Sequence, residues 1–157
     1  MSIKIEKVWH YPRPAIWEYY RGTIEVIHNN EVIAKTKNAI RILETSHPPT
    51  YYIPNDNVVT SLLNKNNDRS FCEWKGTASY FDYYNNNEYI NNIGWCYSNP
   101  YYKFLPIKNF ISFYASKVDK CFVDKKEVFK QEGSYYGGWI TDNLIGPFKG
   151  GEGTEGW

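Results

Sequence analysis

The chain has 157 residues, of which 18 are Lys or Arg and 17 are Asp or Glu, giving a formal net charge of +1. This balance provides no excess of positive charge that would attract nucleic acid or an acidic membrane surface, so we expect neither as a partner. The length fits one domain over residues 1–157, and a domain of that size can bury roughly 70% of its unfolded surface without disulfides or metals.

The first residues and the cysteines both favour an intracellular location. Residues 1–7 lack the apolar run of a signal peptide, and no window approaches the roughly 18 apolar residues of a membrane span. Cys72, Cys96 and Cys121 are widely spaced and form no Cys-x-x-Cys motif. We therefore expect a cytoplasmic protein with reduced core thiols, no metal and no cofactor. A zinc site built from these thiols and His47 is the less favoured alternative.

Aromatic side chains make up 18% of the chain, as 6 Trp, 15 Tyr and 8 Phe. So many tyrosines cannot all lie in an apolar core, because each hydroxyl needs a hydrogen-bond partner or water. They suit either the wall of a cleft or the broad faces of β-sheets.

The N-terminal part of the chain predicts an extended arm followed by a strand meander. Residues 9–14 contain two prolines, which favour an extended arm. Residues 20–28 alternate apolar and polar side chains, and the following Asn-Asn pair suits a tight turn into residues 31–35. Residues 39–44 predict a further short strand.

Residues 43–54 are rich in side chains that can take part in catalysis or ligand binding, including Glu44, His47 and Tyr51. The prolines of this segment exclude an ordinary central strand. Loops held by a scaffold often carry functional sites, so the segment is either part of a site or a plain structural crossover. A lone histidine more often makes a structural hydrogen bond, so His47 adds little by itself.

The longest strand pattern covers residues 71–81. In a regular strand, Glu73 and Lys75 lie on one polar face, whereas Cys72 and Trp74 lie on the opposite face, which we expect to be core. A strand with one row of polar groups either faces water or lines a pocket. This segment is therefore the predicted centre of the fold and of any site.

The segments around this strand have weaker patterns. Residues 55–63 predict a short helix or an irregular turn, and residues 64–68 a polar loop. The asparagines at 85–87 predict a turn into a hairpin partner at residues 88–98. Residues 106–114 are the best helix candidate, since their apolar side chains recur at helical spacing after a proline.

The C-terminal third predicts one more hairpin and an unusual tail. Residues 118–123 and 127–130 form the hairpin, turned at residues 124–126. Residues 133–157 combine many glycines with large aromatic side chains, which disordered segments lack, so we expect an ordered loop. Phosphate binding is disfavoured there, because the Gly-x-x-x-x-Gly-Lys-Ser/Thr motif is absent.

Four segments of the chain resemble the hallmark segments of the domain of unknown function 427 family: residues 43–52, 71–78, 136–141 and 146–151. The resemblance implies a small, mainly β domain of the β-tent (Mss4-like) group, with antiparallel sheets and one or two short helices. That group includes the drug-binding domain of cereblon. Many of its members bind zinc through two Cys-x-x-Cys knuckles, so the resemblance implies a zinc-free variant here.

The family has also been labelled a nucleotidyltransferase. That chemistry normally uses an Asp-x-Asp pair after Gly-Ser to hold magnesium. Gly133-Ser134 is present, but the sequence contains no Asp-x-Asp. The label therefore has little support in this chain.

The favoured function is a module that binds a small molecule or a peptide terminus in an aromatic and polar pocket. Segments 43–54, 71–81 and 133–157 are expected to converge there. Trp74 and Trp95 are candidate walls whose alternation also suits core packing. The predicted ligand-binding residues are Arg13, Glu44, His47, Tyr51, Glu73, Lys75, Tyr136 and Trp139.

Two other classes of function stay open. The first is an enzyme with acid–base chemistry, in which Glu73 or Glu44 acts with Lys75 or His47. Cys72 is a less favoured nucleophile, because its strand phase points it away from the polar face. The second is a structural or protein-interaction domain whose polar rows stabilise the fold.

Overall fold

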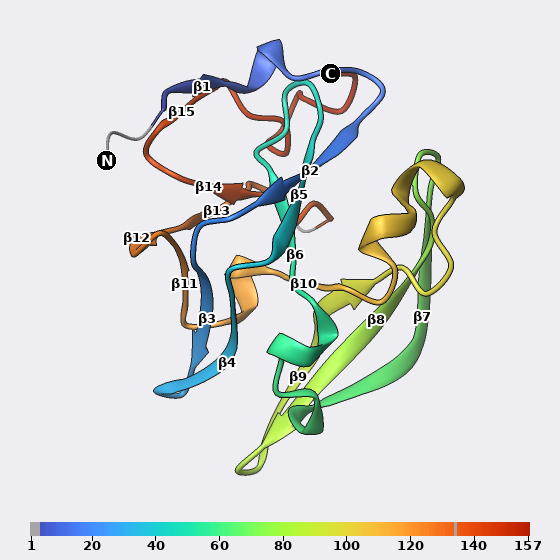
Figure 1. The fold of residues 1–157 in the computed structure, drawn as a ribbon, viewed down its shortest axis with the longest axis vertical. Helices are drawn as coiled ribbons and strands as arrows, with labels where there is room; N and C mark the ends of the chain where they lie inside the picture. The colour runs from blue at the N-terminus through green and yellow to red at the C-terminus, as the bar shows by residue number, and fades with distance from the viewer. Residues whose placement is uncertain (1–3, 134) are drawn as a thin grey trace.

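The computed structural model describes residues 4–133 and 135–157 and is mainly β, as the sequence predicts (Figure 1). Within these residues the strands form two four-stranded sheets, one three-stranded sheet and two strand pairs. All pairings are antiparallel except that of β1 with β15 and two isolated bridges. The arrangement is consistent with a β-tent-like domain.

The first four-stranded sheet has the order β10-β9-β8-β7. Its strands are β7 (Leu63–Cys72), β8 (Gly76–Asn85), β9 (Glu88–Cys96) and β10 (Ile111–Phe113). Asn86 and Asn87 turn the chain between β8 and β9 with φ of 50° and 66°. Asparagine tolerates this left-handed conformation, so the predicted hairpin is confirmed.

The three-stranded sheet has the order β2-β5-β6. Its strands are β2 (Ile16–Tyr20), β5 (Ala39–Leu43) and β6 (Thr50–Tyr52). Glu18, Arg41 and Tyr51 are opposite one another across the three strands and share one face. Side chains alternate along a strand, so Ile42 and Tyr52 lie on the other face.

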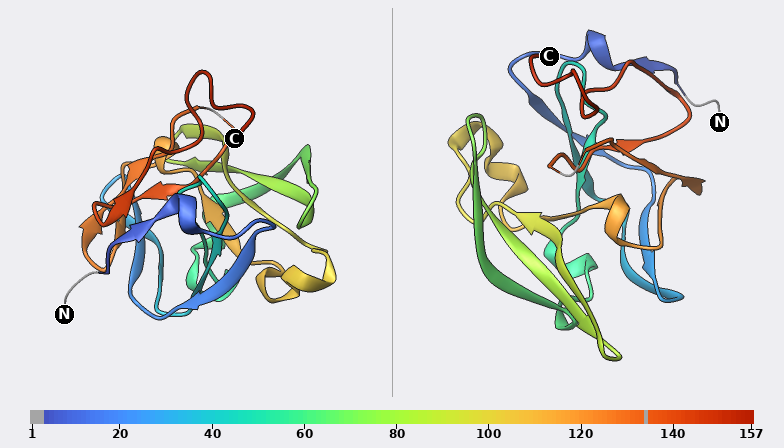
Figure 2. Two further views of the ribbon diagram at one scale, coloured as in Figure 1. Left: turned by 90° about the horizontal axis from the view of Figure 1, so that it is seen from above. Right: turned by 180° about the vertical axis from the view of Figure 1, so that it is seen from behind.

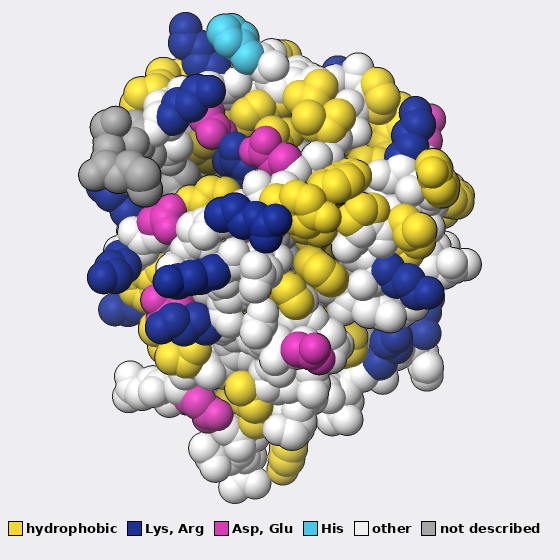
Figure 3. Space-filling model, in the orientation of Figure 1, with side chains coloured by type: hydrophobic (Ala, Val, Ile, Leu, Met, Phe, Trp, Pro, Cys, Tyr) yellow, Lys and Arg dark blue, Asp and Glu magenta, His cyan; other side chains and the backbone are white. Residues whose placement is uncertain are grey.

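The second four-stranded sheet has the order β12-β11-β3-β4. Its strands are β3 (Ile24–His28), β4 (Glu31–Thr36), β11 (Lys120–Val123) and β12 (Lys126–Glu127). Asn29 and Asn30 turn β3 into β4 with φ of 52° and 60°, as the Asn-Asn pair predicts. Figure 3 shows Lys and Arg side chains gathered along this side of the molecule with Asp and Glu among them.

Two short strand pairs and five 3-10 segments complete the described chain. The pairs are β1 (Glu6–Lys7) with β15 (Leu144–Ile145), and β13 (Phe129–Lys130) with β14 (Trp139–Ile140). The 3-10 segments are η1 (Val8–His10), η2 (Asn55–Asn57), η3 (Thr60–Leu62), η4 (Tyr102–Ile107) and η5 (Ala115–Lys117). None of the helices in the described part of the chain is long and apolar enough to cross a membrane.

The main core fills the space between these sheets. Trp139, Tyr83 and Phe113 are its largest fully buried side chains. The indole nitrogen of Trp139 donates a hydrogen bond to the carbonyl oxygen of Phe113 at 3.0 Å. The segment around η1 and the C-terminal end of the chain lie on the same side of the molecule (Figure 2). The ring centroids of Trp9 and Trp157 there lie 5.2 Å apart.

The prediction of one strand over residues 71–81 is wrong. β7 ends at Cys72, residues 73–75 form a turn, and β8 begins at Gly76. Gly76 has φ of 106°, a conformation that glycine adopts without strain. The apparent alternation of charged and apolar residues therefore crosses a hairpin turn, and it does not assign Glu73 and Lys75 to one strand face.

Two other predictions of secondary structure, for residues 64–68 and 106–114, are also wrong. Residues 64–68, expected as a polar loop, lie in β7, whose position at the sheet edge leaves polar side chains free to face water. Residues 106–114, expected as a helix, form the end of η4 and then β10. All three residues of β10 are buried, and a short strand that is buried on both faces can mimic helical spacing.

Gly94 lies where β9 and β10 pack closely against each other. A Cβ atom on Gly94 would lie 2.4 Å from the carbonyl oxygen of Ser112 on β10. Because backbone blocks this space, we expect Gly94→Ala to lower the free energy of unfolding by about 1–3 kcal/mol. Gly156→Ala is the matched control, since a Cβ there meets nothing within 4 Å. Chemical denaturation of both variants checks the prediction, and equal stabilities would contradict it.

Candidate functional site

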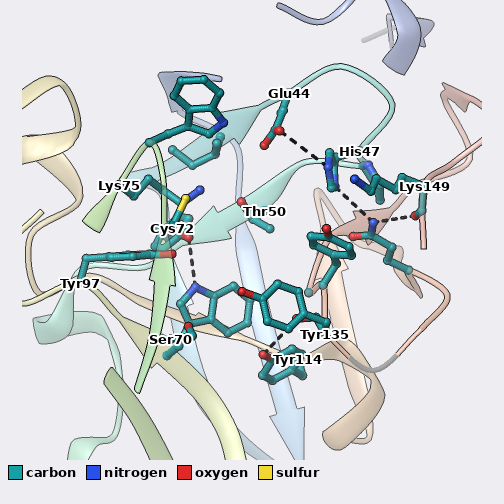
Figure 4. A pocket seen from close by; sticks show the side chains of 18 of the residues that line it. Glu44, His47, Thr50, Ser70, Cys72, Lys75, Tyr97, Tyr114, Tyr135 and Lys149 are labelled. Carbon is teal, nitrogen blue, oxygen red and sulfur yellow. Dashed lines mark hydrogen bonds and ion pairs between the residues drawn. The ribbon is translucent and has the colours of Figure 1, made fainter. Parts of the chain in front are cut away.

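A cavity of about 250 Å³ lies between the β2-β5-β6 sheet and the β7–β9 hairpins (Figure 4). Residues from all three predicted segments line it, so the expected convergence of these segments is observed. From residues 43–54 come Glu44 and His47, from residues 71–81 come Glu73 and Lys75, and from the tail comes Tyr136. The three candidate catalytic residues, Glu73, Lys75 and His47, therefore share one cavity.

Lys75 is the most unusual residue of the cavity. The residue is only 9% exposed, and Figure 4 shows its side chain beside the Cys72 thiol. No carboxylate oxygen of the described residues lies within 4.0 Å of its ammonium nitrogen. The rings of Tyr97 and Phe104 lie 5.8 and 5.9 Å from that nitrogen, at the outer range of a cation–π contact. A buried lysine is normally paired, so this one is an exception.

The ammonium of Lys75 stays charged despite its burial. Burial by itself lowers the pKa of Lys75, but Tyr52, Cys72 and Glu44 outweigh burial and leave the pKa raised. The turn that carries Lys75 is held at its base, because the backbone nitrogen of Tyr101 donates to the carbonyl oxygen of Lys75 at 3.0 Å. The backbone from which this charged side chain extends is therefore held in place.

His47 lies at the other end of the cavity and is neutral. Its Nδ1 accepts a hydrogen bond from the side-chain amide of Gln131 at 3.4 Å, so the ring proton is on Nε2. Burial lowers the pKa of His47 to about 4, helped by the positive charges of Lys149, Lys75 and Arg13. Its ring contacts that of Tyr136, with 4.8 Å between the centroids.

The two carboxylates of the cavity differ in exposure. The Glu44 side chain is 23% exposed, and its Oε2 lies 3.8 Å from Nε2 of His47. Glu73 is exposed on the turn at the rim of the cavity. Neither carboxylate lies within 4.0 Å of the Lys75 ammonium. Glu73 and Lys75, predicted to share one strand face, therefore form no ion pair with each other, because the turn separates residues that a continuous strand would align.

Three predicted ligand-binding residues do not line this cavity. Trp139 is fully buried in the core, and Arg13 is exposed beside the carbonyl oxygen of Thr45. Tyr51 points to the opposite face of β6, where it lines a second cavity of about 560 Å³ together with Arg41. The spacing of β6 explains this, since Thr50 and Tyr52 face the first cavity and Tyr51 alternates with them.

Tyr52, Tyr97 and Cys72 line the cavity but were not among the predicted ligand-binding residues. The sequence could have predicted Tyr52, because side chains alternate along a strand and Tyr52 therefore lies on the same face as Thr50. Cys72, assigned to the core face by its phase, is half-buried and lines the same cavity as Lys75, while Cys96 and Cys121 are buried. Trp74 and Trp95, which the sequence offers as candidates for either a cavity wall or the core, also line the cavity.

Gln131 and Lys149 had no signal in the sequence, because their roles depend on long-range contacts. The Gln131 side chain donates to the carbonyl oxygen of Lys149 at 2.7 Å and accepts from the backbone nitrogen of Gly138 at 3.0 Å. Ser134, of the Gly133-Ser134 pair discussed for nucleotidyl transfer, lies outside the described residues. Across residues 4–133 and 135–157, no group of three or more His, Cys, Asp or Glu side chains is placed to hold a metal ion.

The lowered pKa of His47 makes the stability of the protein depend on pH. The unfolded chain binds a proton at His47 near pH 6.5, whereas the folded chain does so only near pH 4. This contribution is fully present above pH 6.5 and is lost as the pH falls to 4, where unfolding becomes easier by up to about 3 kcal/mol. We expect His47→Gln to remove this part of the pH dependence in urea denaturation between pH 4 and 7.

His10→Gln is the matched control for this measurement, because His10 is exposed and lies outside the cavity. It should leave the wild-type dependence unchanged. If His47→Gln keeps the same slope as the wild type, the neutral, buried state of His47 is disproved.

Comparison with known proteins agrees with the resemblance seen in the sequence. The model of a family described as a domain of unknown function (DUF427) matches residues 16–124, well over half of the chain. No curated protein matches the chain significantly. The matched span contains Glu44, His47 and Lys75, whereas Gln131 and Lys149 lie beyond it. The chain belongs to the domain of unknown function 427 family.

Proposed function

We propose that the protein binds a small planar molecule with a carboxylate or a similar anionic group, and that Lys75 binds this group. The observation that carries the proposal is the buried ammonium of Lys75, which lines a cavity without an ion-pair partner among the described residues. A buried charge is costly unless something neutralises it. An anionic ligand would supply that neutralisation.

The walls of the cavity support a planar ligand. Tyr52, Trp95 and Tyr97 form a connected aromatic group next to Lys75, with ring centroids 6.2 and 6.3 Å apart. The indole nitrogen of Trp95 donates to the Tyr52 hydroxyl at 3.1 Å, which fixes both rings. Rigid aromatic walls favour flat ligands, since stacking adds to the burial of apolar surface.

The size of the cavity limits the ligand. A volume of about 250 Å³ equals that of about eight water molecules at ~30 Å³ each. Drug-sized ligands usually occupy clefts of about 300–1,000 Å³. The cavity therefore suits a small metabolite or the terminal residue of a peptide, with the rest of the peptide outside.

Acid–base catalysis, the alternative class, has weaker support. A general base works best when its pKa lies near the working pH, and a pKa of about 4 makes His47 a poor base at pH 7. The Nδ1 atom of His47 is also occupied by Gln131. The purely structural alternative requires that Lys75 and the nearby carboxylates stabilise the fold as a bonded pair, and no ion pair joins them.

The anion preference can be measured with a matched pair of probes, benzoate and its uncharged amide, benzamide. We expect benzoate to bind the wild-type protein about 10- to 100-fold more tightly, because a charge-assisted hydrogen bond contributes about 1.5–3 kcal/mol. Lys75→Met should remove this preference and leave weak, equal binding of both probes. Isothermal titration calorimetry or ligand-observed NMR gives the two dissociation constants.

Lys149→Met is the control, because Lys149 also lines the cavity but donates to the carbonyl oxygen of Trp157 at 3.1 Å. It should keep most of the preference for benzoate. Equal affinities of the wild type for both probes would refute the proposal. An equal loss in both lysine variants would show that Lys75 is not the anion site.

A further inference from the structure

Glu44 presents a second incompletely satisfied charge to the same cavity. Among the described residues, no side chain or backbone group donates a hydrogen bond of 3.5 Å or less to its carboxylate. The Nε2 atom of His47 lies 3.8 Å from its Oε2 atom, beyond hydrogen-bond distance. His47 is neutral, so it does not balance the negative charge of Glu44.

The backbone around Glu44 is held by several long-range hydrogen bonds. The nitrogens of Thr45 and Ser46 donate to the carbonyl oxygens of Pro12 and Val8, at 3.1 and 3.0 Å. The nitrogen of Lys149 donates to the carbonyl oxygen of Ser46 at 2.8 Å. The side chain of Glu44 therefore extends from a fixed backbone, and a fixed backbone lowers the entropy that is lost when a ligand binds.

The cavity thus holds two opposite charges that do not contact each other. Lys75 and Glu44 both line it, more than 4.0 Å apart, and the charge of Glu44 helps to keep Lys75 protonated. Figure 4 shows Lys75 at one side and Glu44 and His47 at the other, with aromatic rings below. Charges attract strongly when water is excluded. A ligand that reaches both Lys75 and Glu44 would therefore gain binding free energy from an ion pair at each end.

We infer that the ligand is a zwitterion with an aromatic group, in which a carboxylate binds Lys75 and an amine binds Glu44. This inference rests on the proposed function and adds the amine to it. The chemical class is an aromatic amino carboxylate, such as a free amino acid with a planar side chain.

Glu73 is the obvious competitor for the amine, but its position is unfavourable. It lines the same cavity from an exposed turn, whereas the Glu44 side chain is largely buried. An exposed ion pair contributes little, because water and salt screen it. Glu73→Gln is therefore a matched control for Glu44→Gln, since both remove one carboxylate from the same cavity.

The test compares amino carboxylates with analogues that lack only the amine. Phenylalanine is paired with 3-phenylpropionate, and 4-(aminomethyl)benzoate with 4-methylbenzoate, so that two spacings of the charges are covered. For at least one pair, we expect the amine to tighten binding about tenfold or more in the wild type and in Glu73→Gln. Glu44→Gln should abolish that advantage. Calorimetry at pH 7 gives the dissociation constants.

The outcomes separate the two proposals. If the analogues without an amine bind as tightly as the amino carboxylates, the zwitterion inference fails while the anion site at Lys75 stands. If neither kind of probe binds, both fail. An amine advantage that survives Glu44→Gln also overturns the inference. Should Glu44→Gln fail to fold, the wild-type comparison within each pair still decides whether the amine is recognised.

Discussion

Two hydrogen bonds between Ile53 and Ile111 hold the site together. Each backbone nitrogen donates to the other residue's carbonyl oxygen at 2.8 Å, and both side chains are buried. This bridge joins the end of β6 to β10 and so connects the three-stranded sheet to the sheet of β7–β10. The cavity lies between these two sheets, so the distance between Glu44 on one side and Lys75 on the other depends on this connection.

Strand alternation then gives the three-stranded sheet two faces, each of which lines a different cavity. Ile42, Thr50 and Tyr52 face the cavity with Lys75, whereas Arg41 and Tyr51 face the other one. On that second face, Arg41 is paired with Glu6 and Glu18 at 3.0 and 2.6 Å, so its charge is already satisfied. The contrast favours the first face for the proposed ligand, because Lys75 and Glu44 form no such close ion pairs there with the described residues.

The C-terminal tail forms the end of the cavity that contains His47 and holds this histidine in place. Gln131 sets the tautomer of His47 and also holds the backbone at Lys149 and Gly138. Glycine at position 137 lets the tail approach the sheet, because a Cβ there would lie 2.2 Å from the ring of Trp95. The tail is therefore part of the cavity wall, which gives a physical role to its mixture of glycines and aromatic residues.

The sequence by itself determined the mainly β class, the two Asn-turned hairpins and the three segments that meet at the cavity. These features are local: asparagine favours positive φ, and alternation marks a strand, wherever the strand lies. Only the tertiary structure decided that Lys75 follows a turn, that Trp139 is core and that Tyr52 replaces Tyr51 in the cavity. Those facts depend on which strands pair and which face each sheet buries, and no single segment contains that information.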